Sequence, residues 1–285
     1  MAGVFINPKT DFAFKKIFGS QESKDILIGF LNAIVYEGQD TIQDLVIIDP
    51  YQAPRIQGNK TSYLDVKATL ANGTRVIIEM QVLNVLGFEK RVLYNAAKAF
   101  SIQLEVGEDY TGLNPVIALT ITDFELFKGR DRVVSRYRLK ERDDLVDYSE
   151  EFELVFVELP KFTKKVDELT NLLDKWLYFL KSANLLVEVP PNMGEVPAIN
   201  HAFAIAQQSR LSAEELETFE KQQMFIHDNR NALLKAEQEG RQEGRQEGRR
   251  EERLAIARSF LDVLDPESIA QRTGLSIEEV QQLLE

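Results

Sequence analysis

One stretch of the sequence decides the fold: Tyr63-Leu64-Asp65-Val66-Lys67-Ala68-Thr69-Leu70-Ala71-Asn72-Gly73-Thr74-Arg75-Val76-Ile77-Ile78-Glu79-Met80-Gln81-Val82. Polar and apolar residues alternate on both sides of Asn72-Gly73, the pattern of two half-buried strands joined by a turn. The expected apolar face consists of Leu64, Val66, Ala68 and Leu70 on the first strand and Val76, Ile78, Met80 and Val82 on the second. The stretch therefore predicts a β-hairpin with one apolar and one polar face.

The length of the turn fixes which residues face each other. A two-residue turn at Asn72-Gly73 would set apolar residues opposite polar ones along the whole hairpin. A three-residue loop, 71–73, with Gly73 in the left-handed conformation brings the apolar faces together. Asp65 then lies directly opposite Glu79, with Cβ atoms about 4.5–5.5 Å apart.

Two carboxylates in these positions repel each other, so a shared proton, the Lys67 ammonium or a divalent cation must offset the repulsion. Oxygen ligands suit Mg²⁺ or Mn²⁺. The chain has no cysteine and only two histidines, His201 and His227, which disfavours thiol nucleophiles, histidine bases and cysteine–histidine metal cages. The alternative interpretation is a solvated polar sheet face without a ligand.

Several stretches together resemble the PD-(D/E)XK nuclease superfamily, and within it the recombination-promoting nuclease or transposase group. They are residues 10–19 (TDFAFKKIFG), 64–68 (LDVKA), 78–81 (IEMQ), 88–94 (FEKRVLY) and 158–162 (ELPKF). The resemblance implies an α/β fold with a mixed central sheet flanked by helices. It also implies metal-dependent hydrolysis of DNA phosphodiester bonds, with Asp65 and Glu79 as ligands of Mg²⁺ or Mn²⁺.

The chain departs from the superfamily pattern at two positions. Leu64 stands where the pattern has proline, and Gln81 stands where it usually has lysine. A glutamine can orient water by hydrogen bonds but carries no positive charge. We expect Gln81 to position the attacking water. We name Lys67 as the first candidate for the missing cation, and Lys90 or Arg91 as the second.

Asp11 opens the first predicted helix and allows two interpretations. A carboxylate favours a helix N-terminus, and capping is the preferred interpretation. The resemblance also implies that an acidic residue of the first helix joins the metal ligands. Lys15, on the same helix, is a candidate contact for DNA phosphate or part of a solvated helix face.

A polar stripe follows the second hairpin strand. Arg91, Tyr94 and Lys98 recur at helical spacing on the predicted helix 86–106. Together with Lys90 they are candidate contacts for DNA phosphates. The equally weighted alternative is an exposed stripe whose stems cover the sheet.

The remaining pattern predicts an α/β core followed by helices. Further helices are expected at 11–18 and 22–36, and further strands at 44–49, 115–124, 132–142 and 152–159. Helical periodicity begins at residue 166, and 190–194 is the one conspicuous linker. The expected domains are a nuclease-like domain at 1–235, a charged repeat at 236–253 and a small helical module at 254–285.

The charged repeat consists of three copies of Gln-Glu-Gly-Arg from residue 238 to residue 249. A helix of this sequence sets like charges at i, i+4, and each glycine costs it about 1 kcal/mol relative to alanine. We expect a homo-oligomer contact or a flexible spacer here, with a fraying charged tail as the alternative. The module at 254–285 has a helix-turn-helix-like spacing but few base-reading side chains, so we expect it to pack rather than read DNA.

The net charge of −12 disfavours general affinity for nucleic acid. Residues 1–130 are nearly neutral, with 13 basic and 15 acidic side chains, so a local basic surface is compatible with a DNA substrate. No apolar stretch is long enough to span a membrane, and we expect a cytoplasmic protein. The leading hypothesis is a metal-dependent DNA endonuclease linked to recombination or mobile elements. The competing hypotheses are a non-catalytic DNA- or protein-binding module on a nuclease scaffold, and a regulator acting through the C-terminal helices.

Overall fold

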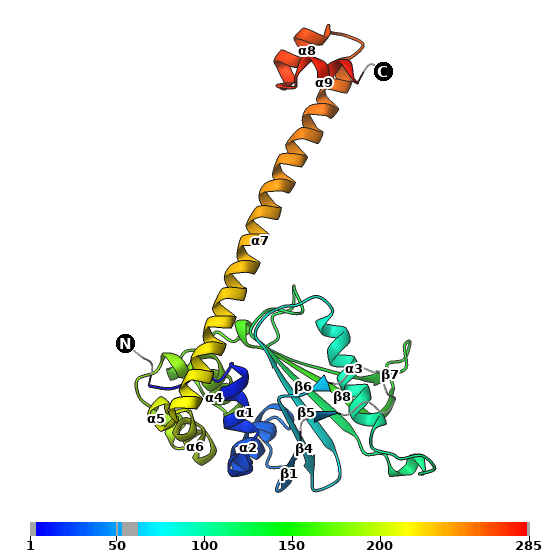
Figure 1. Ribbon diagram of the computed structural model, residues 1–285. Coiled ribbons are helices and arrows are strands. Elements are labelled where there is room, and N and C mark those ends of the chain that lie inside the picture. Colours follow the sequence, from blue (N-terminus) through cyan, green and yellow to red (C-terminus); the bar gives the residue numbers. More distant parts are fainter. Residues whose placement is uncertain (1–3, 50, 53–61, 284–285) are drawn as a thin grey trace. The chain divides into compact units, whose positions relative to one another are not determined.

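The computed structural model describes residues 4–49, 51–52 and 62–283. The chain divides into two compact units, Met1–Ile226 and His227–Glu285. The larger unit contains a six-stranded mixed sheet with helices on both of its faces (Figure 1). The predicted α/β class with a helical C-terminal region is confirmed.

The sheet has the strand order β1-β4-β5-β6-β8-β7. β5–β6 and β6–β8 are parallel, and the remaining pairs are antiparallel. The strands are β1 (Leu45–Ile48), β4 (Val66–Leu70), β5 (Arg75–Gln81), β6 (Val116–Thr122), β7 (Val134–Lys140) and β8 (Asp147–Glu158). Two short strands, β2 (Tyr51–Gln52) and β3 (Ser62–Tyr63), pair separately.

The hairpin β4–β5 has the predicted register. Val66 pairs with Ile78 and Ala68 with Val76, so the even-numbered residues face each other. The loop is the expected three-residue one, and Gly73 has a φ of +89°. A side chain at residue 73 would also collide with Asn114, because an added Cβ would lie 2.2 Å from its Oδ1.

Helices α1 (Asp11–Phe18), α2 (Lys24–Ile34), α4 (Leu172–Ser182) and α6 (Pro197–Ala206) pack with the face of the sheet that carries Val66, Val76 and Ile78. Aromatic rings fill this core: Phe14, Phe18, Phe30, Trp176, Phe179 and Phe203 are all fully buried. Helix α3 (Phe88–Ser101) covers the opposite face, where Ala96 and Ala99 pack with Ile77 and Ala118.

The alternation predicted for the first hairpin strand fails at its beginning. Leu64 packs in the core cluster under α3 with Ile77, whereas Val66 packs in the cluster that includes α1 and α2. The chain bends at Asp65, and β4 begins only at Val66. The bend reverses which face the preceding residue occupies, so the prediction that Leu64 shares a face with Val66 is wrong.

Two other boundaries differ from expectation. The expected linker at 190–194 contains a short helix, α5 (Pro191–Gly194), with proline at a helix start where its missing N–H costs nothing. Strand β8 begins at Asp147 rather than at residue 152, and its register with β7 shifts between Arg138 and Lys140.

The smaller unit has its own apolar core. Ala257, Ile269, Leu275 and Val280 are buried there. Helix α8 (Pro266–Thr273) is capped by Asp265, and α9 (Ile277–Gln281) begins with the predicted capping box of Ser276 and Glu279. Gly274, with a φ of +70°, ends α8 in the left-handed conformation.

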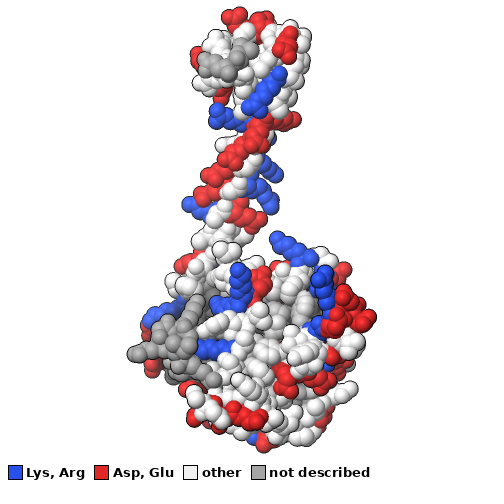
Figure 2. Space-filling model, turned by 90° about the vertical axis from the view of Figure 1, so that its right-hand side faces the viewer, with Lys and Arg blue, Asp and Glu red and all other residues white. Residues whose placement is uncertain are grey.

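The charged repeat is helical. It lies within α7 (Ala213–Phe260), whose first fourteen residues belong to the larger unit. All repeat residues are exposed, and red and blue side chains lie side by side along this helix in Figure 2. Among the described residues, no atom approaches within 4 Å of a Cβ added at Gly240, Gly244 or Gly248.

No helix in the described part of the chain combines the length and apolarity that a membrane span needs.

Candidate functional site

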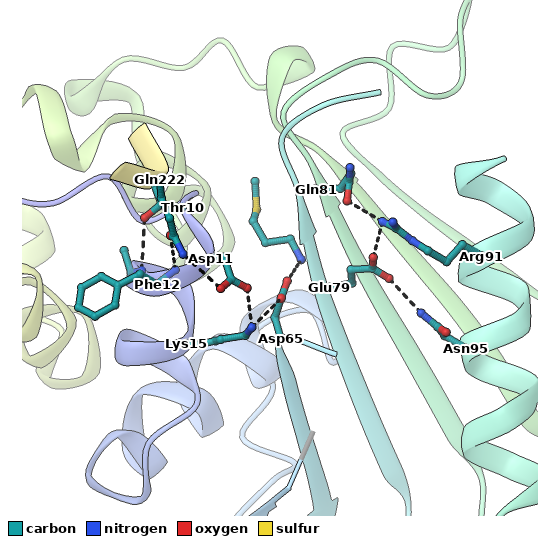
Figure 3. A network of polar contacts seen from close by, with 12 residues as sticks. Thr10, Asp11, Phe12, Lys15, Asp65, Glu79, Gln81, Arg91, Asn95 and Gln222 are labelled. Atoms are coloured by element: carbon teal, nitrogen blue, oxygen red, sulfur yellow. Dashed lines mark hydrogen bonds and ion pairs between the residues drawn. The ribbon is translucent and has the colours of Figure 1, made fainter. Parts of the chain in front are cut away.

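The predicted site residues come from α1, β4, β5 and α3. Strand β5 lies in the middle of Figure 3, with Asp65 and α1 on one side and α3 on the other. Asp65 is at the bend before β4, and Glu79 and Gln81 are the last two odd-numbered residues of β5. The fold therefore brings Asp11, Asp65, Glu79 and Gln81 to one end of the hairpin.

Asp65 lies beside β5 where β4 has ended. Its Oδ2 accepts a hydrogen bond of 2.6 Å from the Met80 amide, and its own amide donates to the Ile78 carbonyl at 3.2 Å. The carboxylate thus replaces a backbone acceptor of the ladder and is held at the sheet edge. Only 14% of the side chain is exposed.

Asp11 of α1 approaches this carboxyl group. Both side chains pair with the same basic residue, Lys15. The Lys15 ammonium lies 2.6 Å from Asp11 Oδ1 and 3.8 Å from Asp65 Oδ1 (Figure 3). Two carboxyl groups and one ammonium from two segments distant in sequence therefore form one cluster.

The capping interpretation of Asp11 is wrong. Thr10 is the N-cap residue of α1, and its hydroxyl accepts from the Ala13 amide at 3.3 Å. A second free amide of the helix start, that of Phe12, donates to Gln222 Oε1 of α7 at 2.7 Å. Since these side chains satisfy the helix start, the Asp11 carboxylate is left to meet Lys15 and Asp65.

The environment shifts the acidity of Asp65. Burial raises the pKa of Asp65 to about 7, the Met80 hydrogen bond opposes the rise, and the neighbouring Asp11 carboxyl adds to it. The Lys15 charge has a smaller opposing effect. At neutral pH a substantial share of the free chains therefore holds a proton on Asp65, where a bound cation would supply positive charge.

Glu79 faces α3. Its Oε1 lies 2.5 Å from Arg91 Nη2, and its Oε2 accepts a long hydrogen bond of 3.4 Å from Asn95. Burial raises the pKa of Glu79 despite the opposing effects of Arg91 and Asn95. The expectation that Asp65 and Glu79 share one polar face is not met, because the bend turns Asp65 towards α1 while Glu79 points towards α3 (Figure 3).

Arg91 joins Glu79 and Gln81. The same Nη2 that contacts Glu79 donates to Gln81 Oε1 at 2.6 Å, while the Gln81 amide nitrogen donates to the Leu83 carbonyl at 2.7 Å. A positive charge thus lies directly beside the residue that replaces the usual lysine. The second-ranked candidate for this charge is the one in contact.

Lys67, the first-ranked candidate, lies elsewhere on the hairpin. It pairs with Ile77, and burial together with the charge of Arg75 lowers its pKa, while Asp49 raises it. Lys90, the other second-ranked candidate, is exposed on α3. The structure therefore places Arg91, rather than Lys67, beside Glu79 and Gln81.

The predicted polar stripe of α3 is only partly accessible. Tyr94 is 43% exposed, and the Lys98 ammonium lies 5.9 Å from the centre of its ring. Lys98 itself is buried, and this burial lowers its pKa. On the face seen in Figure 2, basic side chains of the larger unit are interspersed with acidic ones. Contacts to DNA phosphates by this stripe remain a prediction.

Comparison with protein families identifies the chain. The model described as PD-(D/E)XK nuclease family transposase matches residues 8–236. The chain belongs to this family. Comparison with curated proteins and with solved structures found no significant match. The matched range contains the whole sheet and every residue of the α1–β4–β5–α3 cluster, so this PD-(D/E)XK chain is related to nucleases and transposases.

The residues of the cluster can be tested against the divalent ion that this family generally uses. Asp11 and Asp65 fit in chemistry and position, because both carboxylates already approach one ammonium, that of Lys15. Glu79 fits in chemistry, but Arg91 holds it. Among the described residues, three acidic or histidine side chains do not gather closely enough to form a complete metal site.

Two residues of the cluster escaped the sequence analysis. Gln222 holds the start of α1, and Asn95 donates to Glu79. Asn95 follows Arg91 by one helical turn, so the spacing of the α3 stripe was a usable signal for it. Nothing local marks Gln222, because its contact depends on how α7 packs against α1.

Proposed function

We propose that this PD-(D/E)XK chain is a Mg²⁺- or Mn²⁺-dependent endonuclease that hydrolyses phosphodiester bonds of DNA, in a process linked to recombination or mobile elements. Family membership supports a role related to nucleases and transposases. Action in the cytoplasm and homo-oligomer formation through residues 236–253 belong to the same proposal.

One observation carries the proposal: Asp11 and Asp65 gather around the Lys15 ammonium beside the strand that bears Glu79 and Gln81. Two carboxylates beside one ammonium carry a net negative charge, so a proton or a further cation favours their approach. The structural role of Asp65, which accepts from the Met80 amide, does not require Asp11 nearby, whereas a hard divalent ion requires several oxygen ligands together. The cluster has the composition that the ion needs.

The proposed ligands are Asp65, Glu79 and Asp11. To serve as a ligand, Glu79 must turn its carboxylate from Arg91 to the ion. Arg91 Nε and Asn95 Oδ1 are buried without a hydrogen-bond partner in the described part of the chain. Since buried polar atoms are normally paired, this side of the cluster can gain hydrogen bonds by rearranging. When bound, the ion would polarise the phosphate of the substrate and lower the pKa of a water molecule.

The remaining residues act on the substrate. Arg91 supplies the positive charge that Gln81 lacks and can pair with a phosphate through its planar donors. Gln81, once released from Arg91, can orient the attacking water with its amide. Lys15, Lys90, Tyr94 and Lys98 are the proposed contacts to the DNA backbone, and Lys67 stays a secondary candidate for charge.

A second function has its own support. Each acid of the cluster is neutralised by a basic side chain of the same chain, Lys15 for Asp11 and Asp65 and Arg91 for Glu79. Ion pairs within the chain thus offset part of the acidic charge without a metal, which favours a non-catalytic DNA- or protein-binding module on a nuclease scaffold.

Plasmid nicking separates the two functions. Purified chain should convert supercoiled plasmid to the open circle with Mg²⁺ or Mn²⁺, and Asp65→Asn should lower the rate by at least about a hundredfold. Asp44→Asn is the matched control, because Asp44 also pairs with a lysine of a neighbouring helix, Lys24. Equal rates for wild type and Asp65→Asn would favour the binding module.

A further inference from the structure

Lys15 occupies a particular place in the cluster. Its ammonium lies 2.6 Å from Asp11 and 3.8 Å from the Oδ1 atom of Asp65, while the other oxygen of Asp65 is held by the Met80 amide (Figure 3). The oxygen that is free of the backbone is thus the one that faces the lysine. The ammonium lies beside both acids that the proposed function assigns to the metal ion.

The neighbouring lysine shows that this placement is not a general property of α1. Lys16 pairs with Glu215 of α7 at 2.5 Å, and Glu215 is not part of the cluster. Lys15 and Lys16 are thus the same residue type on the same helix, and each pairs with an acidic side chain. The acidic partners of Lys15 belong to the candidate metal site, whereas the partner of Lys16 does not. Substitutions of the two lysines can therefore be compared as a test and its control.

We propose that Lys15 is a built-in competitor of the metal ion: its ammonium compensates Asp11 and Asp65 in the free chain and leaves them when a divalent ion binds. This inference rests on the proposed function. An ammonium and a divalent ion repel strongly at the distance at which each contacts a carboxylate. Simultaneous contact of both cations with Asp11 and Asp65 therefore costs free energy, and we expect the Lys15 ion pair to be lost when the divalent ion binds.

Displacement gives Lys15 a second use. The side chain is 41% exposed, so the released ammonium lies at the surface next to the site rather than in the core. There it can pair with a phosphate of the substrate. The phosphate contact predicted for Lys15 then depends on the ion being bound, which couples metal binding to substrate binding.

Calorimetric titration of the full chain with MnCl₂, without DNA, tests the inference. Lys15→Met keeps the length of the stem and removes the charge, and Lys16→Met is the control. We expect Lys15→Met to bind Mn²⁺ roughly tenfold more tightly than wild type, with Lys16→Met unchanged. Lys15→Arg keeps a cation and should not bind more tightly.

Thermal unfolding gives a second measurement on the same proteins. Without Mn²⁺, Lys15→Met should unfold at a lower temperature than wild type, because two carboxyl groups lose their counter-charge. With Mn²⁺ it should gain more in unfolding temperature than wild type, because its ion binds more tightly. Lys15→Gln provides the same comparison if Lys15→Met does not fold.

The outcomes separate the two proposals. If wild type binds Mn²⁺ and Lys15→Met binds it equally or more weakly, Lys15 is not a competitor of the ion, and the proposed nuclease function is unaffected. Absence of Mn²⁺ binding in wild type and in Lys15→Met overturns both.

Discussion

Asp11 of the first helix and Asp65 at the bend before β4 both pair with the Lys15 ammonium, at 2.6 Å and 3.8 Å. Neither residue has an obvious structural need for the other. Thr10 and Gln222 satisfy the helix start, and Asp65 is anchored by the Met80 amide. The neighbouring Asp11 contributes to the raised pKa of Asp65, and acids with shifted pKa values cluster at functional sites.

The first prediction concerns pH. The pKa of Asp65 is raised from 3.8 to about 7 in the folded chain, so between about pH 4 and 7 the folded chain binds more protons than the unfolded chain. The free energy of unfolding without metal should therefore fall as the pH rises through this range. Asp65→Asn removes the titrating group, and it should be more stable than wild type at pH 8 by on the order of 2 kcal/mol, with a smaller difference at pH 5.

Urea unfolding at the two pH values measures this difference. Asp44→Asn is the control with the opposite shift, because the hydrogen bond from Lys24 lowers the pKa of Asp44. Asp44 is ionised at both pH values in the folded and the unfolded chain, so its substitution should have the same effect at each. An Asp65→Asn variant that is equally destabilised at pH 5 and pH 8 would contradict the raised pKa of Asp65.

The second prediction concerns the charge beside Gln81. Arg91→Met removes the cation that contacts Glu79 and Gln81 and should slow plasmid nicking. Gln81→Lys alone should not raise the rate, because it places a second cation against Arg91. The double variant, Arg91→Met with Gln81→Lys, should recover activity relative to Arg91→Met, because the cation stands in the position usual for the superfamily.

Arg138→Met controls for the loss of an ion pair elsewhere. Arg138 is 42% exposed and pairs with the buried Glu153, much as Arg91 is 39% exposed and pairs with Glu79. Both substitutions should destabilise the fold by about 1–2 kcal/mol, but only Arg91→Met should affect nicking. Full activity of Arg91→Met would show that another residue supplies the charge.

The third prediction concerns Gln222. Its carbonyl oxygen accepts from the Phe12 amide, and its nitrogen lies 3.5 Å from Asp11 Oδ2. Gln222→Ala should destabilise the larger unit by about 1 kcal/mol, the usual cost of a lost helix cap, and should weaken Mn²⁺ binding because Asp11 loses a neighbour. Gln222→Glu keeps the acceptor but places a negative charge near Asp11.

Gln223→Ala is the control for that experiment, since Gln223 is exposed on the same helix. Unfolding temperature and Mn²⁺ titration should leave this variant indistinguishable from wild type. If Gln222→Ala behaves in the same way, α7 does not position Asp11.

The fourth prediction concerns the charged repeat. Replacing Gly240, Gly244 and Gly248 with alanine should stabilise the helix by about 1 kcal/mol per residue, because each added Cβ meets open space in the described structure. If the glycines let two chains approach closely, the triple variant should also self-associate less in sedimentation experiments. Stronger helix formation with unchanged association would exclude the glycines as the contact.

Much of the hairpin was predictable from local pattern. The alternation of residues 66–82 fixed the three-residue loop, the left-handed Gly73 and the pairing of Val66 with Ile78. These features depend on neighbours in sequence and on a two-residue period. The capping box at Ser276 was predictable for the same reason.

The errors lie where distant segments decide the geometry. Alternation placed Leu64 with Val66, but the chain bends at Asp65, where the carboxylate replaces a backbone acceptor. Asp11 is not the cap, because the hydroxyl of the adjacent Thr10 takes that role and the distant Gln222 accepts from the next free amide of the helix start. Arg91 was ranked below Lys67 because its reach from α3 to β5 depends on how the helix packs on the sheet.

The central claim is that Asp65, Glu79 and Asp11 hold one hard cation. Anomalous diffraction from crystals soaked in MnCl₂ tests it most directly. We expect an anomalous peak about 2.1 Å from carboxylate oxygens of Asp65 and Glu79. The ion pairs of Lys15 with Asp11 and Asp65 and of Arg91 with Glu79 should then be broken. A Mn²⁺-saturated crystal that shows no peak at these residues, with the Asp11–Asp65 and Glu79–Arg91 contacts intact, would contradict it.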